Sequence, residues 1–421
     1  MKKRTNQVSG RAAWGIGDQI FSSATNFGVN ILIARSLGAS AFGAFSIAFS
    51  TYLVFLNLSR AVNTEPLAIR FSGVEESSWK AGTRRASAST LAAGAVGALI
   101  CLIVAGLSNG DVSDSFLALA ITLPGLLYLD MWRFAFFAQG KGQRAMHTDV
   151  LWAIFMVPAM VWALSTPEPT LFLTALAWGG SATLAAVVAA IVWGVLPAFR
   201  QIPEWLRTHR DLTPSFVGEM ATVSGASQLS LIGIGLVSGL AAVGAYRAAY
   251  VLFGPLRVIY QGLTLFGVPE AVRVLRESPQ RLRRTTRLAA GALALIALAY
   301  GIALLMMPDS WGEFVLGETW APMKPLIVPF TIGVVGVGLS MPTYIGLRAL
   351  EAAKEAFKTH LTLAGFGVLL TIGGAAVGGA AGAAWADRTF LFLGSGLWWH
   401  VYDRELDKRE AIAAQIPEAV S

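Results

Sequence analysis

The sequence has too little charge to cover the surface of a soluble globule. Only 14% of its 421 residues are charged, whereas 55% are hydrophobic. Soluble domains carry about 25% charged residues. The composition therefore excludes a soluble globular protein and indicates a chain that lies mostly within a membrane.

The sequence has only one cysteine and no nucleotide-binding motif. The single cysteine, Cys101, lies in an apolar run, so one chain can form neither a disulfide nor a thiolate metal site. No Walker-type phosphate loop is present, which argues against direct coupling to ATP. We expect no cofactor other than a coupling Na⁺ or H⁺, and no nucleotide or nucleic-acid partner.

Long hydrophobic runs are what the sequence has in abundance. Runs near 20 residues, each long enough to cross roughly 30 Å of hydrocarbon, recur about twelve times. We predict an all-α polytopic membrane protein with about twelve transmembrane helices. Their approximate centres are Phe27, Tyr52, Ala98, Leu127, Phe155, Val187, Ser227, Leu252, Ile296, Val335, Val368 and Phe392.

The basic residues predict the topology. Lys and Arg gather at both termini and in every second predicted loop, while the loops between hold only Arg35, Lys324 and Arg388. This asymmetry is the positive-inside pattern with both termini cytoplasmic. The formal charge of +7 follows from that topology and needs no nucleic acid.

The two halves of the chain are similar to each other. Gly17-Asp18 aligns with Gly218-Glu219, and Gly38 aligns with Gly239, at one spacing of 201 residues. With small shifts in spacing, a Pro-x-Ala-x-Arg segment and a Leu-Ala-Ala-Gly-Ala segment also recur in the same order. These matches are Pro66 to Arg70 with Pro269 to Arg273, and Leu91 to Ala95 with Leu288 to Ala292.

Internal duplication predicts two homologous six-helix bundles, residues 1–205 and 206–421. Six is an even number, so both bundles enter the membrane from the same side and are parallel repeats. Transporters built from such repeats bind substrate between their halves.

The first predicted helix pair resembles that of bacterial polysaccharide transporters in the multidrug/oligosaccharidyl-lipid/polysaccharide (MOP) flippase superfamily. The close resemblance covers about 35 residues, and the layout of two bundles extends it along the chain. The residues that carry it are Asp18-Gln19, Ser22-Ser23, Asn26-Phe27, Ala34-Arg35, Leu37-Gly38, Phe42-Gly43 and Phe45.

The resemblance implies a V-shaped, MATE-like protein with a polar central cavity in the bacterial cytoplasmic membrane. It implies a flippase, not an enzyme, that moves a lipid-linked glycan precursor on polyprenyl pyrophosphate to the outer leaflet by alternating access. Membrane lipids and a glycan polymerase or other assembly machinery are the expected partners. The sugar and the lipid length stay open.

Polar residues on the predicted first, second and eighth helices fall on one face of each helix. Such a face should turn toward other helices or water, because each unpaired polar group in hydrocarbon costs several kcal/mol. Arginine is the most informative, since its fork suits the oxygen pairs of a pyrophosphate. The candidate substrate-binding residues are Arg60, Arg247, Arg257, Asn57, Gln261, Asn26 and Ser22.

Alternatives stay open for each of these residues. Serines on membrane helices commonly bond a neighbouring helix, and Arg60 or Arg257 could extend to the interface instead. Asp18 and Glu219, at equivalent places in the two halves, are candidates for ion coupling or for a gate that pairs with arginine.

Four further charged residues are assigned no substrate role. Asp130 and Arg133, three residues apart, are expected to neutralise each other. Asp387 and Arg388 lie near the external end of the last predicted helix, too shallow for an assignment.

Three rival functions are considered. A cation-coupled multidrug exporter has the same architecture. Its cavity should favour cationic substrates, and the arginines within the predicted membrane helices argue against that. A membrane glycosyltransferase or ligase needs accessible acidic groups and usually a sizeable outer loop. The longest predicted outer loop, Pro308 to Pro322, offers Asp309, Glu313 and Glu318 but no histidine. A scaffold that transports nothing would not need buried arginines.

Overall fold

All elements of the described chain are helices. A computed structural model describes residues 2–214, 216–218 and 225–415, and the side chains of residues 25–214, 216–218, 225–260, 263 and 267–411. The chain divides into two compact units, residues 1–228 and 229–421. The division falls within the helix that begins at Gly225, after the boundary at residue 205 that the sequence predicts. The predicted boundary between the two six-helix bundles stays a prediction.

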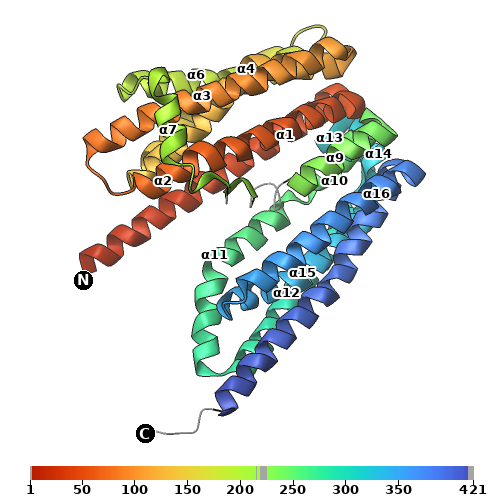
Figure 1. The fold of residues 1–421 in the computed structure, drawn as a ribbon. Helices are drawn as coiled ribbons and strands as arrows, with labels where there is room; N and C mark the ends of the chain where they lie inside the picture. Colours follow the sequence, from red (N-terminus) through yellow and green to blue (C-terminus); the bar gives the residue numbers. More distant parts are fainter. Residues whose placement is uncertain (1, 215, 219–224, 416–421) are drawn as a thin grey trace. The chain divides into compact units, whose positions relative to one another are not determined.

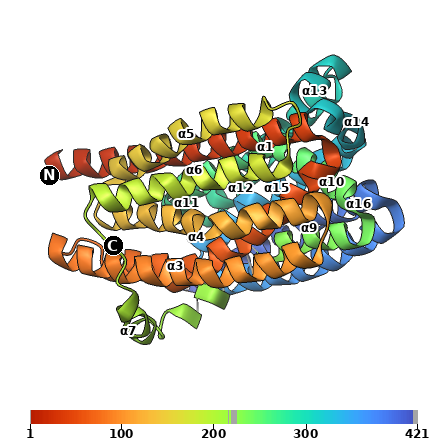
Figure 2. The same ribbon diagram turned by 90° about the horizontal axis from the view of Figure 1, so that it is seen from above.

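Unit 1 contains a very long first helix that continues through a π-helical turn. Figure 1 traces these elements in red to yellow-green, and Figure 2 shows α3, α4, α5 and α6 running alongside one another. The elements are α1 (Lys2–Ser59), η1 (Arg60–Thr64), α2 (Glu65–Arg70), α3 (Glu76–Leu107), α4 (Gly110–Ala138), α5 (Gly142–Leu164), α6 (Leu171–Val192), η2 (Phe199–Gln201) and α7 (Ile202–Thr208).

Unit 2 begins within α9 and ends with another very long helix. Its elements are α9 (Gly225–Ser238), α10 (Leu240–Leu252), α11 (Gly254–Glu277), α12 (Pro279–Leu305), α13 (Asp309–Leu316), η3 (Gly317–Thr319), α14 (Trp320–Met323), η4 (Lys324–Leu326), α15 (Ile327–Ala349) and α16 (Ala353–Gln415). The segment expected as the longest outer loop is therefore largely helical.

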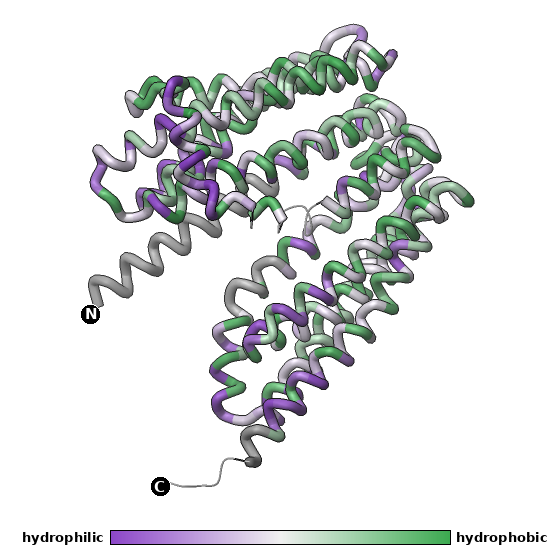
Figure 3. The backbone as a smooth tube through the Cα atoms, in the orientation of Figure 1, coloured by the Kyte–Doolittle hydropathy of each residue, from purple (hydrophilic) through white to green (hydrophobic). Residues whose placement is uncertain are grey.

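The helices confirm the predicted fold class, a polytopic all-α membrane protein. Eight helices of the described residues are long and apolar enough to cross a membrane. Two of these eight contain a sharp break, at Gly38 in α1 and at Gly378–Gly379 in α16, so each contains two helical stretches. Together with the shorter α9 and the α10–α11 pair, the helices account for each predicted centre. Figure 3 shows hydrophobic residues along these helices and hydrophilic residues near α7 and where α11 meets α12.

The segment predicted as the eighth transmembrane helix forms two helices instead of one. The sequence interpretation places Arg247, Arg257 and Gln261 on one regular helix, but α10 ends at Leu252 and α11 begins at Gly254. Pro255, at the start of α11, explains the break because it has no N–H to continue the hydrogen bonds of α10. A helical wheel drawn across residues 252–254 is therefore wrong.

Two glycines have matching backbones at the positions that the internal repeat aligns. Gly38 has φ 75° and ψ 174°, and Gly239 has φ 83° and ψ 173°. Only glycine adopts this conformation readily. The same turn therefore joins the first two helical stretches of each repeat, as duplication at this spacing expects.

Helices α4 and α15 are the centres of their units. α4 packs against α1, α3, α5 and α6, and α15 packs against α11, α12 and α16. The close contacts of α4 with α6 recur between α15 and α16 at constant spacings. Matching positions of α4 and α15 are 211 residues apart, and matching positions of α6 and α16 are 209 residues apart. The contacts pair Thr122 with Gly179 and Gly125 with Thr183 in unit 1, and Gly333 with Arg388 and Gly336 with Phe392 in unit 2.

The two halves of α16 pack closely beyond their glycine turn. Gly374 and Gly382 approach each other so closely that a Cβ on either one would meet the backbone of the other. Glycine at both positions therefore permits this hairpin to close at Gly378–Gly379.

The linker after α6 completes the hydrogen bonding of α1 and its continuation. Pro66 cannot donate to the carbonyl of Val62, four residues earlier. The indole of Trp205, on α7, donates to that carbonyl at 3.3 Å. α7 is further held by Arg70, which donates to the Thr208 carbonyl and pairs with Asp211 at 2.6 Å.

Replacing Gly239 with alanine should destabilise the protein. The Cβ would meet open space, so the cost is backbone strain of about 1–3 kcal/mol. The measurement is the apparent melting temperature of the detergent-solubilised protein. Gly106→Ala is the control, because Gly106 is helical and also faces open space. Equal melting temperatures for Gly239→Ala and the wild type would contradict this account.

Candidate functional site

Several candidate residues lie outside the described part of the structure. Glu219 is not among the described residues, and the side chains of Asp18, Ser22 and Gln261 are not described although their helices are. The roles proposed for these four residues stay predictions.

Two asparagines lie on α1 as expected. Asn26 is half-buried, and its carbonyl accepts a 2.7 Å hydrogen bond from the side chain of Asn30 one turn later. Asn57 is also half-buried, one turn before Arg60. Both side chains are therefore partly accessible, and their contact with substrate stays a prediction.

Arg60 is engaged by a carboxylate of its own unit. Its Nε and Nη2 donate to the two oxygens of Asp130 on α4 at 2.9 and 2.6 Å. The guanidinium also lies 5.3 Å from the ring centre of Phe134. Arg60 keeps 27% of its side chain exposed, while Asp130 keeps 7%. A substrate phosphate would have to displace Asp130 to use this fork.

The expected pairing of Asp130 with Arg133 is wrong. Asp130 pairs with Arg60, and Arg133 lies 3.3 Å from Asp149 on α5, which is 1% exposed. One helical turn separates Asp130 from Arg133, but each side chain finds a better-placed partner on another helix. Tyr52 on α1 interacts electrostatically with all four charged groups. Among the residues that the structure describes, the cluster joins α1, α4 and α5 and contains two positive and two negative groups.

A π-helical turn begins at Arg60 and runs to Thr64. Such turns are rare overall, but a large share of those that occur lie at functional sites. The extra residue in the turn changes the direction of the side chains that follow, so the face predicted for an ideal helix does not extend beyond Arg60. Pro66, two residues past the turn, provides a cause because it interrupts the regular hydrogen-bond series.

Arg247 and Arg257 gather around one aromatic ring in unit 2. The guanidinium of Arg247, on α10, lies 5.3 Å from the ring centre of Tyr250, and that of Arg257, on α11, lies 4.4 Å from it. Arg247 is half-buried and Arg257 is exposed. The helix break therefore still leaves both predicted arginines beside Tyr250.

A polar network in unit 2 was missed by the sequence interpretation. The hydroxyl of Tyr246 donates to Asp387 at 2.6 Å and accepts from Arg388 at 2.8 Å. The Arg388 guanidinium lies 4.1 Å from the ring centre of Phe330 on α15. The three polar groups close a ring of contacts that links α10 to α16.

Asp387 and Arg388, which the sequence left without an assignment, lie largely buried within unit 2. Asp387 follows the turn at Gly379 by eight residues, a rise of roughly 12 Å into the helix. Asp387 and Arg388 keep only 16% and 11% of their side chains exposed. The sequence contains one indication that these two residues pair with other polar groups. They are the only Asp, Glu, Lys or Arg residues between Lys358 and Asp403.

Arginine is the only charged residue type in one long stretch of unit 2. Arg247 and Arg257 are the only charged residues from Gly225 to Pro269 in the sequence. Among the described residues, no cluster of three His, Cys, Asp or Glu side chains could hold a metal ion. The arrangement around Tyr250 suits an anionic or sugar-bearing ligand better than a cation.

The Arg60–Asp130 pair should show strong energetic coupling. Arg60→Gln or Asp130→Asn alone leaves a partner without its counter-charge, which costs 3–5 kcal/mol in fully buried pairs and should cost less here, about 1–3 kcal/mol. The double variant should be less destabilised than the sum of the single variants. Thermal unfolding of the four proteins in detergent measures this, and additive effects would argue against the pair.

Comparison with known proteins identifies the fold. No protein-family model and no curated protein matches the sequence. Among solved structures, the chain is similar to an inward-facing multidrug resistance MATE transporter of the MOP superfamily, with TM-score 0.67, 12% identity, and coverage of 92% of this chain and 95% of that chain. It is similar to the lipid II flippase MurJ in an inward closed conformation, with TM-score 0.69, 12% identity, and coverage of 94% and 89%.

A third similar structure is a MOP superfamily transporter from Pyrococcus furiosus, whose binding pocket is described as having reverse polarity that suggests a different function. Its TM-score is 0.54 at 10% identity, with coverage of 95% of both chains. Identities this low establish the fold and leave the substrate open. The chain is therefore a multi-pass membrane protein with the fold of MATE and MurJ transporters of the MOP superfamily.

Proposed function

We propose that the protein is a MOP-type transporter that flips a lipid-linked oligosaccharide or polysaccharide precursor, carried on polyprenyl pyrophosphate, across the bacterial cytoplasmic membrane. It moves the sugar-phosphate head from the cytoplasmic to the outer leaflet by alternating access, with both termini cytoplasmic. The fold shared with transporters and with a lipid II flippase supports this class of function.

The observation that carries the substrate class is the pair of arginines around Tyr250. Two guanidinium groups lie near one half-buried aromatic ring on helices whose sequence holds no acidic residue from Gly225 to Pro269. Guanidinium forks bind the paired oxygens of a pyrophosphate, and an aromatic face suits the apolar face of a sugar ring. Gln261, Asn57, Asn26 and Ser22 are proposed to add polar contacts.

The membrane potential is a sufficient energy source in principle. An anionic head that moves outward from an interior-negative cytoplasm gains about 2.3 kcal/mol per charge per 100 mV. Asp18 and Glu219 are proposed as groups that bind a coupling H⁺ or Na⁺ or that gate the path. A glycan polymerase or other assembly machinery would use the product.

The second candidate function is a cation-coupled multidrug exporter. The similarity to MATE multidrug transporters favours it, whereas the arginines of α10 and α11 disfavour a cationic drug. A MOP superfamily transporter with a pocket of reverse polarity supports the view that this fold accommodates substrates of different charge.

Deletion of the gene should cause one lipid-linked glycan to accumulate on the cytoplasmic face of the membrane. Wild-type protein should clear it, and Arg247→Ala should reduce clearance at least tenfold, because a desolvated charged hydrogen bond contributes about 1.5–3 kcal/mol. The measurement is mass spectrometry of extracted lipid-linked glycans together with the protein level in the membrane.

The control is Arg276→Ala, an exposed arginine at the end of α11, which should clear the glycan normally. Wild-type clearance by Arg247→Ala would remove that arginine from the substrate site. Dye efflux from cells that overproduce the protein, together with no accumulated glycan in the deletion strain, would instead establish the drug-exporter alternative.

A further inference from the structure

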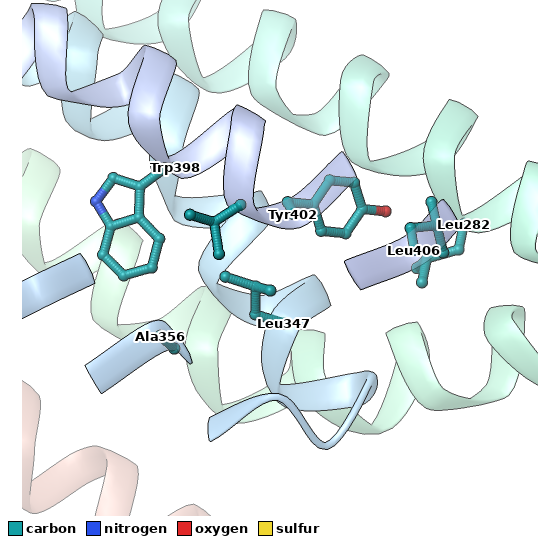
Figure 4. Close-up of a cluster of buried hydrophobic side chains, with 7 residues drawn as sticks. Leu282, Leu347, Ala356, Trp398, Tyr402 and Leu406 are labelled. Atoms are coloured by element: carbon teal, nitrogen blue, oxygen red, sulfur yellow. The ribbon is translucent and has the colours of Figure 1, made fainter. Parts of the chain in front are cut away.

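The start of α12 is held in a fixed rotation by a hydrophobic cluster. Leu282 is 2% exposed and packs with Leu347, Tyr402 and Leu406 (Figure 4). One turn later, the hydroxyl of Thr286 lies 3.0 Å from that of Tyr402. Leu282 and Thr286 therefore define the face of α12 that points into unit 2.

The opposite face of α12 starts with two arginines. Arg284 lies two residues from both Leu282 and Thr286, a rotation of roughly 200 degrees, and both Arg284 and Arg287 are exposed. The same face continues with Leu288, Leu295 and Ile302, which are 64%, 67% and 45% exposed. Large apolar side chains exposed along a membrane-spanning helix contact acyl chains.

The length of this apolar face places the two arginines at the membrane surface. No charged residue occurs between Leu288 and Leu305. Eighteen helical residues rise about 27 Å, close to the roughly 30 Å thickness of the hydrocarbon. Arg284 and Arg287 therefore lie at the level of the lipid headgroups, on the same face of α12 as these exposed apolar side chains.

Neighbouring arginines form ion pairs, whereas these two form none with the side chains that the structure describes. Arg283 contacts Asp403, Asp407 and Glu410, and Arg281 lies 2.7 Å from Glu277. Within the part of the chain that the structure describes, neither Arg284 nor Arg287 has an acidic side chain within ion-pair distance. Two like charges at i and i+3 are close neighbours and repel each other unless an anion joins them.

We propose that Arg284 and Arg287 form a binding site for the phosphate of an anionic phospholipid such as phosphatidylglycerol, whose acyl chains lie along Leu288, Leu295 and Ile302. The charge of the headgroup complements the arginine pair, and the tails complement the apolar face below it. The site is on the outer surface of α12 and does not depend on what the protein transports.

The test uses purified full-length protein in nanodiscs or detergent with defined lipids. Phosphatidylglycerol should bind the wild type, detected by native mass spectrometry and by a rise in melting temperature, and phosphatidylcholine should not. Arg284→Gln with Arg287→Gln should weaken phosphatidylglycerol binding by up to about 30-fold, since each basic residue near an anionic surface contributes about 1 kcal/mol. High salt should weaken wild-type binding as well.

Two matched variants separate a specific site from general charge. Arg207→Gln with Arg210→Gln removes the same charge from exposed residues of unit 1 and should leave binding within about twofold of the wild type. Arg284→Lys with Arg287→Lys keeps the charge and should retain most of the binding. An equal loss in the Arg207/Arg210 variant, or no loss in the Arg284/Arg287 glutamine variant, would overturn the proposal.

Inorganic phosphate distinguishes a lipid site from a simple anion site. The proposal expects free phosphate to leave the melting temperature unchanged at concentrations where phosphatidylglycerol raises it, because the apolar contacts of the tails are then missing. Equal stabilisation by free phosphate would contradict the assignment to phospholipid.

Discussion

A polar group within the hydrocarbon of a membrane is costly unless it has a partner inside the protein or lines a water-filled space. That constraint explains why Trp205 donates to the carbonyl that Pro66 leaves open, and why Arg60 and Asp130 form a two-bond fork. It also explains the ring of contacts among Tyr246, Asp387 and Arg388. A polar residue in such a helix is therefore stable when a hydrogen-bond or ion-pair partner is present on a neighbouring helix.

The two repeats show how one backbone can carry two chemistries. Phe45 of unit 1 packs edge-on against Trp178 at 5.8 Å, whereas the aligned residue of unit 2, Tyr246, bonds Asp387 and Arg388. Where α4 contacts α6 in unit 1, Thr122 packs against Gly179. At the matching contact of α15 with α16 in unit 2, Gly333 packs against Arg388. The glycine has moved to the opposite helix, and this vacates the volume that Arg388 occupies.

Local features of the sequence predicted the fold well. The spans follow from hydropathy, and the breaks at Gly38 and Gly239 lie where the internal repeat aligned two glycines. Ion pairs could not be predicted in the same way, since Arg60 and Asp130 are 70 residues apart and the helix rotations that bring them together depend on packing. The π-helical turn at Arg60 and the break before Pro255 also change side-chain directions that an ideal helix extrapolates wrongly. The arginines beside Tyr250 were predicted as a pair, but their common aromatic neighbour appears only in three dimensions.

The closed glycine hairpin of α16 has a practical consequence for labelling. Gly374 and Gly382 leave no volume between the two arms, so a spin label attached at either position would separate the arms and disturb the fold. The tip of the hairpin at Gly378–Gly379, where an added Cβ would meet open space, is a better position for a label. Reporters of conformational exchange are best attached there.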